Sequence, residues 1–367
     1  MRLTYAAGMI SLMLLPAAVF CQFRKYSNEF LNIGAGARGL AMGSAQVSTA
    51  GDGTAGYWNP AGLTEVENTS LDFMHASYFS NIAKYDFGSV AIPVNDGKRT
   101  LGLSVLRFAV DDIPNTLFLV EPDGSINYNN IQTFSSADYA FLFSFAQKIK
   151  DADNYKMSFG ANAKVIHRKV GHFAQAFGFG LDAGFKMKKN NWSIGVVAKD
   201  FTTTFNAWTF DFTEQEKEVL YLTNNGIPIK STELTSPRIT FGGSYNFAFG
   251  SSFNLLAAAD FDFTFDGKRN TLLSGNTVSI DPHLGLEASI DNAFFIRCGI
   301  TNFQQALSDG DTTNQKKVWI YQPSLGAGFR VKNLNIDYAF SNLANQSNPL
   351  YSHIFSLRLN MAKREKD

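Results

Sequence analysis

Three glycines near the N-terminus have the spacing of a nucleotide-binding loop. Gly34, Gly36 and Gly39 form the pattern G-x-G-x-x-G within the stretch NIGAGARGLAMGSA. In a dinucleotide site, such a loop follows a strand, opens a helix and has an acidic residue about 20 positions further on. Asp52 lies only 13 residues after Gly39, and an apolar N-terminal segment precedes the loop. We therefore expect neither a bound nucleotide nor another cofactor.

No other group of residues has the spacing of a catalytic or metal site. The closest histidines, His167 and His172, have no cysteine or acidic residue beside them that would complete a metal site. Nothing in the sequence indicates the serine, histidine and acid of a hydrolase. The acidic stretches at 151–154 and 309–311 are typical of turns, and calcium binding there is the weaker alternative. We therefore predict a protein that is not an enzyme and that binds no metal.

The first 21 residues have the pattern of a secretory signal peptide. Arg2 is the only charged residue among them, and an apolar run from Ala6 to Leu15 follows it. This run is shorter than the about 20 residues that a membrane-spanning helix needs. We predict cleavage after Cys21. Acylation of Cys21 is the weaker alternative, because bulky Phe20 stands where a small residue is needed.

The composition of the remaining chain excludes several classes of protein. Removal of Arg2 leaves 31 of the 32 basic residues against 32 acidic ones, so no surface for nucleic acid is indicated. Cys298 is then the only cysteine, which excludes an intramolecular disulfide. The sequence has 34 phenylalanines and 30 glycines, but no long apolar run outside the signal peptide. These features favour an exported sheet protein.

From about residue 68 onward, apolar and polar residues alternate repeatedly. Odd positions from Phe177 to Phe185 are apolar, and even positions from Gly178 to Lys186 are small or polar. This period of two is that of a strand with one apolar face. Strands of about ten residues with a small, polar second face favour a barrel whose apolar face contacts lipid. A soluble sandwich would have shorter strands and an apolar interior.

The predicted fold is all-β, a 14-stranded antiparallel transmembrane β-barrel at 68–361 with a charged C-terminal tail at 362–367. Short turns such as 95–98 alternate with mostly long loops such as 111–133, with 80–84 and 168–172 as short exceptions on the long side. We expect the short turns in the periplasm and the long loops outside the cell. The predicted strands are 69–79, 85–94, 99–110, 134–148, 155–167, 173–186, 191–201, 237–247, 253–264, 279–290, 293–300, 318–330, 334–341 and 352–361.

The alternation also assigns charged residues to the lumen. We expect these residues to form ion pairs with one another, since unpaired charge is costly at membrane depth. Cys298 alternates with Phe294, Ile296 and Ile300 and is therefore expected to face lipid. The lumen residues are Arg238, Asp260, Asp262, Glu287, Arg330, Asp337 and Arg358.

Residues 22–67 lack the alternation and contain many glycines and alanines, so we predict a small N-terminal plug in the barrel lumen. This segment resembles the N-terminal signature of the PorV/PorQ group of Bacteroidetes, within the FadL-like superfamily of fourteen-stranded barrels of the cell outer membrane. The match covers about 35 residues, and Arg38 is expected to pair with an acid of the lumen. The residues that the resemblance assigns to the plug motif are Gly36, Arg38, Gly39, Met42, Gly43, Trp58, Asn59 and Pro60.

The resemblance implies a role in type IX protein secretion. PorV-like proteins bind the C-terminal signal domains of secreted cargo through extracellular loops and act with other secretion-system components. FadL-like proteins instead take up hydrophobic small molecules. That alternative predicts an apolar pocket beside the plug, and a lumen sealed by paired charges would argue against it. The expected partners are outer-membrane lipid and, in the first case, secreted cargo proteins and secretion-system components.

The predicted loop 202–236 is the candidate binding surface for such partners, because it carries several aromatic residues. The same side chains could equally pack over the barrel mouth as a lid. The residues are Phe205, Trp208, Phe210, Phe212 and Tyr221.

Overall fold

The structure of the chain, a computed structural model, describes residues 27–121, 123–307, 317–341 and 351–361. The predicted signal peptide, residues 22–26 of the predicted plug and the predicted tail at 362–367 lie outside these residues. Within the described part, no helix combines the length and the hydropathy that a membrane crossing requires.

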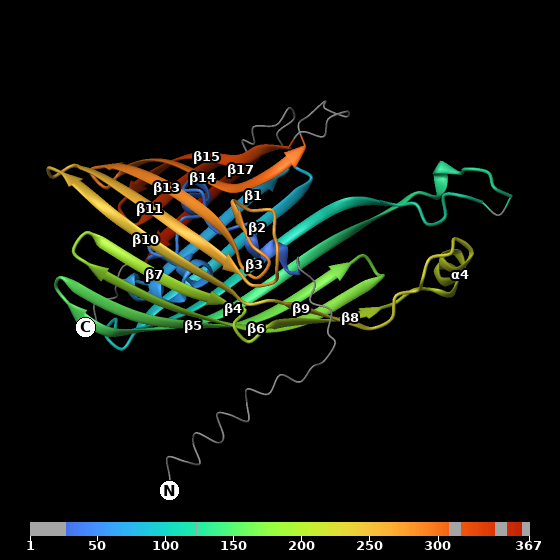
Figure 1. Cartoon of the computed structure of the whole chain (residues 1–367), viewed down its shortest axis with the longest axis horizontal. Coiled ribbons are helices and arrows are strands. Elements are labelled where there is room, and N and C mark those ends of the chain that lie inside the picture. The colour runs from blue at the N-terminus through green and yellow to red at the C-terminus, as the bar shows by residue number, and fades with distance from the viewer. Residues whose placement is uncertain (1–26, 122, 308–316, 342–350, 362–367) are drawn as a thin grey trace, which may run out of the picture.

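The described residues form one antiparallel sheet of seventeen strands, and this sheet closes on itself (Figure 1). β1 pairs with β2 on one side and with β17 on the other. Three short strands, β8, β9 and β12, add to one end, and the other fourteen form the ring. The ring strands are β1 (Ser70–Tyr78), β2 (Ala83–Val94), β3 (Arg99–Asn115), β4 (Gln132–Ala152), β5 (Tyr155–Val170), β6 (Ala174–Lys189), β7 (Trp192–Lys199), β10 (Arg238–Phe249), β11 (Phe253–Thr264), β13 (Ser279–Ile290), β14 (Phe294–Leu307), β15 (Lys317–Val331), β16 (Leu334–Ser341) and β17 (Ser352–Asn360).

The predicted all-β barrel of fourteen antiparallel strands is therefore confirmed. The main differences lie at strand ends, where β3, β4 and β14 continue beyond their predicted limits. The register shifts between Val110 and Ile113 in β3, and between Thr301 and Gln304 in β14. Such bulges insert unpaired residues and break the period of two, so the alternation ends before the strand does.

The predicted loop 202–236 contains three regular elements: β8 (Thr204–Phe210), α4 (Glu214–Leu222) and β9 (Ser231–Thr235). β8 pairs with the first part of β6, whereas β7 pairs with the second part. The β8–β9 hairpin thus continues the wall where β7 ends. A short strand β12 (Leu273–Ser274) lies between β11 and β13.

The two ends of the barrel differ in their connections. At the short-turn end, strands are joined by a few residues, such as Asn190 (φ 51°) and Asn191 between β6 and β7. At the long-loop end, the β3–β4 connection, with its helical turn η3 (Tyr128–Asn130), and α4 project away from the ring (Figure 1). The described part of the chain thus has the predicted asymmetry between its two ends.

Alternation places large apolar side chains outside the ring and mostly small or polar ones inside. On β4, Phe143 is 54% exposed, whereas Ser144 is buried. Cys298 on β14 is exposed next to Ile296, as predicted. The barrel therefore has an apolar outer wall, whereas its inner wall is polar except where large buried side chains such as Tyr85 and Leu106 lie.

The N-terminal segment, residues 27–66, lies inside the ring (Figure 1). It consists of loops and four short helices, η1 (Glu29–Asn32), α2 (Ala37–Ala41), α3 (Ala55–Trp58) and η2 (Pro60–Glu65). Its Tyr57 and Trp58 belong to one buried apolar cluster with Tyr85 of β2 and Leu106 of β3. The largest apolar cluster of the described residues thus joins this segment to the inner wall.

Candidate functional site

An ion-pair chain holds α2 of the N-terminal segment to the inner wall. Arg38 donates from Nε to Glu287 Oε2 at 2.8 Å and from Nη2 to Glu287 Oε1 at 3.0 Å. Glu287 also accepts from Arg297 Nε at 2.6 Å, and Arg297 Nη1 donates to Asp337 Oδ1 at 2.6 Å. The expectation that Arg38 pairs with a lumen acid is confirmed, and four alternating charges join α2 to β13, β14 and β16.

A second group of charges holds the loop before α3. Arg358 of β17 pairs with Asp52 of the segment, and its Nε donates to Asp72 Oδ1 on β1 at 2.7 Å. The Asp52 carboxylate also accepts from the Thr54 backbone amide at 2.9 Å. Arg358, which was predicted to face the lumen, therefore contacts both the barrel wall and the N-terminal segment.

Two of the predicted lumen charges have other partners than an ion pair. Asp260 Oδ2 accepts from the backbone amides of Gln46 and Val47 at 2.7 and 2.8 Å. The Arg330 guanidinium lies 5.2 Å from the centre of the Phe295 ring. The prediction of mutual ion pairs is wrong for these two residues, because the segment supplies amide donors to one and an aromatic ring faces the other.

Glycines on the wall allow the segment's backbone to approach it closely. Met42 and Gly43 lie against Gly285 and Gly299, where a Cβ would come within 2.5 Å of Met42 O and 2.0 Å of Gly43 N, respectively. Gly43 itself has φ of +59°, and its own Cβ would lie 2.6 Å from Ile300 N. Both sides of this contact therefore require residues without a side chain.

Two of the three glycines of the G-x-G-x-x-G pattern, Gly34 and Gly39, pack against Trp58, and the third, Gly36, packs against Thr54. A Cβ on Gly39 would lie 2.9 Å from Trp58 Cζ2. Trp58 Nε1 donates to Ala35 O at 2.8 Å, and the Gly34 amide donates to the Tyr57 hydroxyl at 2.9 Å. Gly36 precedes α2 with φ of 82°. Gly34 and Gly39 thus make room for Trp58 inside the segment.

Asn59 and Pro60 fix the segment to the opposite wall. Asn59 is fully buried, and its Nδ2 donates to Val47 O at 2.9 Å and to Phe185 O of β6 at 3.0 Å. A Cβ on Gly160 of β5 would come within 2.3 Å of the Pro60 carbonyl carbon. All eight residues of the plug motif are thus either inside the segment's core or at its contacts with the wall.

A pocket of about 470 Å³ opens at the long-loop end, between the segment and the wall. Its side chains are mostly polar and paired. Arg238 Nη2 donates to Asn32 Oδ1 at 2.7 Å, and His283 Nδ1 lies 2.6 Å from Thr301 Oγ1. Tyr78, Phe79 and Leu40 supply an apolar part. The pocket therefore has a more polar lining than the apolar pocket that the transport alternative predicts.

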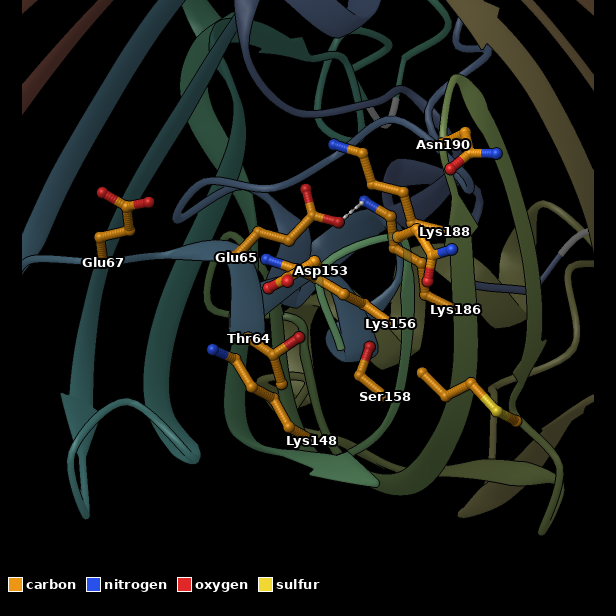
Figure 2. A pocket seen from close by; sticks show the side chains of 12 residues that line it. Thr64, Glu65, Glu67, Lys148, Asp153, Lys156, Ser158, Lys186, Lys188 and Asn190 are labelled. Atoms are coloured by element: carbon orange, nitrogen blue, oxygen red, sulfur yellow. Dashed lines mark ion pairs between the residues drawn. The ribbon is translucent and has the colours of Figure 1, made fainter. Parts of the chain in front are cut away.

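A second pocket, of about 400 Å³, lies at the short-turn end. Figure 2 shows lysines from three neighbouring strands around it, including Lys148 of β4, Lys156 of β5 and Lys186 of β6. Lys186 is buried and donates to Glu65 Oε1 at 2.9 Å and to Ala50 O at 2.8 Å. Residues 27–66 thus separate two polar pockets at opposite ends of the lumen.

The aromatic residues of the predicted binding loop do not form one exposed surface. Phe205, Trp208 and Phe210 lie on β8, and Trp208 points inward with the Arg168 guanidinium 5.1 Å from its ring centre. Phe212 packs on Phe173 at a ring distance of 5.9 Å. Only Phe205 and Tyr221 are exposed large residues among the five, at 43% and 79%. Trp208 is buried because strand alternation turns it toward the lumen, and the role of the loop in docking stays a prediction.

Several charged residues of the lumen were not predicted from the sequence. Arg297 is one, although its position between Ile296 and Cys298 gives it the inward parity. Lys164 is another; its Nζ lies 2.8 Å from Asp182 and 2.5 Å from Asp200. Both could have been found by assigning every residue between two outward positions to the lumen.

Taken together, the fold and the lumen define a closed barrel of the outer-membrane type whose interior is occupied by its own N-terminal segment. No family model and no curated protein matches the chain. Solved structures do match. The toluene transporter TbuX of Ralstonia pickettii has a TM-score of 0.55 at 13% identity, with 90% of this chain and 99% of that chain covered.

Two further structures have the same architecture. The toluene transporter TodX of Pseudomonas putida has a TM-score of 0.54 at 11% identity and covers 89% of this chain and 98% of its own. The CymD monoaromatic hydrocarbon channel has a TM-score of 0.52 at 13% identity, with coverages of 90% and 98%. The chain therefore has the fold of these outer-membrane transporters and channels. Membership of the PorV/PorQ group stays a prediction.

Proposed function

We propose that the protein is an outer-membrane channel for small organic molecules of mainly apolar character, and that residues 27–66 act as its movable plug. The observation that carries this proposal is the position of the segment between two pockets at opposite ends of one lumen. The barrels of like fold, described as toluene transporters and a monoaromatic hydrocarbon channel, support this over cargo binding.

The charges inside the barrel limit how such a channel would work. The ion pairs of Arg38 and Arg358 and the glycine contacts of Met42 and Gly43 fill the space between the pockets. Passage would therefore require the segment to move relative to the wall. The polar lining at the long-loop end favours molecules that carry a polar group beside an apolar body.

A reversible cross-link between segment and wall tests the proposal. A Cβ built on Gly56 of α3 lies 3.8 Å from Ser144 Cβ of β4, which is the usual Cβ separation in a disulfide. The variant Gly56→Cys/Ser144→Cys, made in a Cys298→Ser background, would join the two when oxidised. Uptake of toluene and of decanoate would be measured in cells whose lipopolysaccharide layer otherwise excludes both.

We expect uptake to fall on oxidation and to return on reduction, while the Gly56→Cys single variant stays insensitive to redox state. Equal uptake by the oxidised and reduced forms would show that the segment does not gate the lumen. No uptake above vector-only cells in either state would exclude the channel itself.

A second candidate function is docking of secreted proteins, which the PorV/PorQ resemblance implies. Exposed apolar side chains on the long-loop end favour it: Tyr128 is 70% exposed, Tyr221 79% and Leu222 73%. The variant Tyr221→Ser/Leu222→Ser should then lose secreted proteins that co-purify with the wild type and share a C-terminal domain. Under this function, the Gly56–Ser144 cross-link should leave their capture unchanged.

A further inference from the structure

A groove of about 680 Å³ runs along the outside of the barrel over β1, β2 and β3. Its floor is Gly88 of β2, whose cross-strand neighbours are Phe73 and Val105. A Cβ on Gly88 would meet only Phe73 Cδ1, at 3.8 Å. Phe355 and Leu357 of β17 extend the apolar lining. The groove thus exists because glycine interrupts a row of large outward side chains.

A polar cluster closes the groove toward the long-loop end. His75, Asp86, Arg107 and Tyr139 stand opposite one another in register on β1, β2, β3 and β4. Asp86 bridges two of them, because its Oδ1 lies 2.7 Å from His75 Nδ1 and its Oδ2 lies 3.1 Å from Arg107 Nη1. Arg107 Nε lies 3.4 Å from the Tyr139 hydroxyl. Within the described residues, Arg107 Nη2 and His75 Nε2 have no partner.

This cluster marks a change of chemistry along each strand. On β3, the outward residues from Leu101 to Val105 are apolar, whereas Asp111 follows on the other side of Arg107. On β2, Val90 and Ile92 precede the short turn, and Lys84 lies beyond Asp86. Arg99 begins β3 at the short-turn end. The eight residues from Arg99 to Arg107 span about 20 Å along the membrane normal at the usual strand tilt. The cluster therefore stands at the edge of the apolar band.

We propose that the groove binds a membrane lipid with an anionic phosphate headgroup. The acyl chain lies over Gly88, and the phosphate accepts hydrogen bonds from Arg107 and His75. Asp86 and Tyr139 orient the Arg107 guanidinium, so that its free N–H groups can donate to a phosphate. A lipid is the occupant that fits because an apolar groove and a cationic end adjoin where hydrocarbon meets headgroup. This inference does not depend on what passes through the lumen.

The opposite wall supplies a matched control. A groove of about 650 Å³ lies over β10, β11, β13 and β14. It also contains an outward glycine, Gly243, whose Cβ would meet nothing within 4 Å. None of its lining residues carries a charge. It therefore offers the same space for an acyl chain without a partner for a phosphate.

Native mass spectrometry of the full chain in detergent would test the proposal. The probes are phosphatidylglycerol and phosphatidylcholine with identical chains. We expect the wild type to prefer phosphatidylglycerol by about fivefold or more, the factor that one basic side chain near an anionic headgroup contributes. Gly88→Leu and Arg107→Gln should both lose this preference, and Gly243→Leu should keep it. Asp86→Asn should keep or increase it, because the competing anion is removed.

The faster migration of unboiled protein in gels would confirm that each variant is folded. A wild type without preference, or equal losses in Gly88→Leu and Gly243→Leu, would overturn the proposal. Retention of the preference in Arg107→Gln would do the same. Loss of the preference in Arg107→Gln together with its full retention in Gly88→Leu would show that the cluster binds an anion without the groove, and not a lipid.

Discussion

The Arg38 guanidinium and the Glu287 carboxylate meet at 2.8 Å although 249 positions separate them in the sequence. Arg38 belongs to the N-terminal segment and Glu287 to the inner wall, so this pair ties the two parts of the molecule together. Both side chains are largely buried, at 17% and 10% exposure. Buried, doubly hydrogen-bonded pairs of this kind are costly to break from one side only.

Replacement of Arg38 should loosen the segment without preventing barrel formation. Arg38→Gln leaves Glu287 with Arg297 as its remaining cation, so we expect a loss of about 1.5–3 kcal/mol in the free energy of unfolding. A double-mutant cycle with Glu287→Gln, measured by urea titration in detergent, should give a coupling above about 1 kcal/mol. Lys217→Gln, which breaks the exposed pair with Glu214, is the control and should change stability by about 0.5 kcal/mol or less. Similar effects of Arg38→Gln and Lys217→Gln would contradict this prediction.

The contact of Pro60 with Gly160 should not tolerate a side chain. Gly160→Val places a Cβ about 2.3 Å from the Pro60 carbonyl carbon, so η2 must shift or the wall must deform. We expect a loss of about 1–3 kcal/mol, as for other overpacked sites. Amide hydrogen exchange over residues 55–65 should become faster. Gly243→Val, on the open outer wall, should leave this exchange unchanged; equal protection in the two variants would refute the contact's role.

The junction between α4 and the β5–β6 turn should weaken in acid. Glu216 caps α4 through Thr213 and lies 2.8 Å from His172 Nε2. Burial raises the pKa of Glu216, but the hydrogen bonds from Thr213 and His172 outweigh it and hold that pKa below its usual range. A lowered carboxylate pKa stabilises the fold above the ordinary glutamate value, and this stabilisation is lost as the pH falls through the lowered one.

Hydrogen exchange in α4 should therefore rise, relative to the rest of the chain, between neutral pH and about pH 3. Glu216→Gln keeps the hydrogen bond to the Thr213 amide but does not titrate, so its protection should vary less with pH. An unaltered pH dependence in Glu216→Gln would assign the effect to another group.

Trp208 and Tyr221 should differ sharply in their effect on stability. Trp208 is buried beneath Arg168, and its replacement by alanine should cost about 3 kcal/mol or more. Tyr221 is 79% exposed, and Tyr221→Ala should change stability by about 0.5 kcal/mol or less. Urea titration of both variants checks this. Equal costs would mean that Trp208 does not pack against the inner wall.

The sequence by itself determined the barrel, because alternation with a period of two fixes which residues face outward on each strand. It placed Cys298 outside and Glu287 inside, and it predicted that Arg38 would find an acid in the lumen. It did not predict the ends of β3 and β14, because bulges at Val110 and Thr301 interrupt the period. Nor did it show that β8 extends the wall, since that depends on pairing with β6, which is not the neighbouring strand in the sequence.

Only the tertiary structure decided which groups meet. Arg38 pairs with Glu287 because of how the ring closes around the segment. For the same reason, Asn59 and Pro60 lie against Gly160 and Gly184. Local sequence carries no information on partners that ring closure brings together from distant strands. The outer cluster of Asp86 and Arg107 likewise arises from cross-strand register. Local pattern therefore set the faces of the strands, and barrel closure set their contacts.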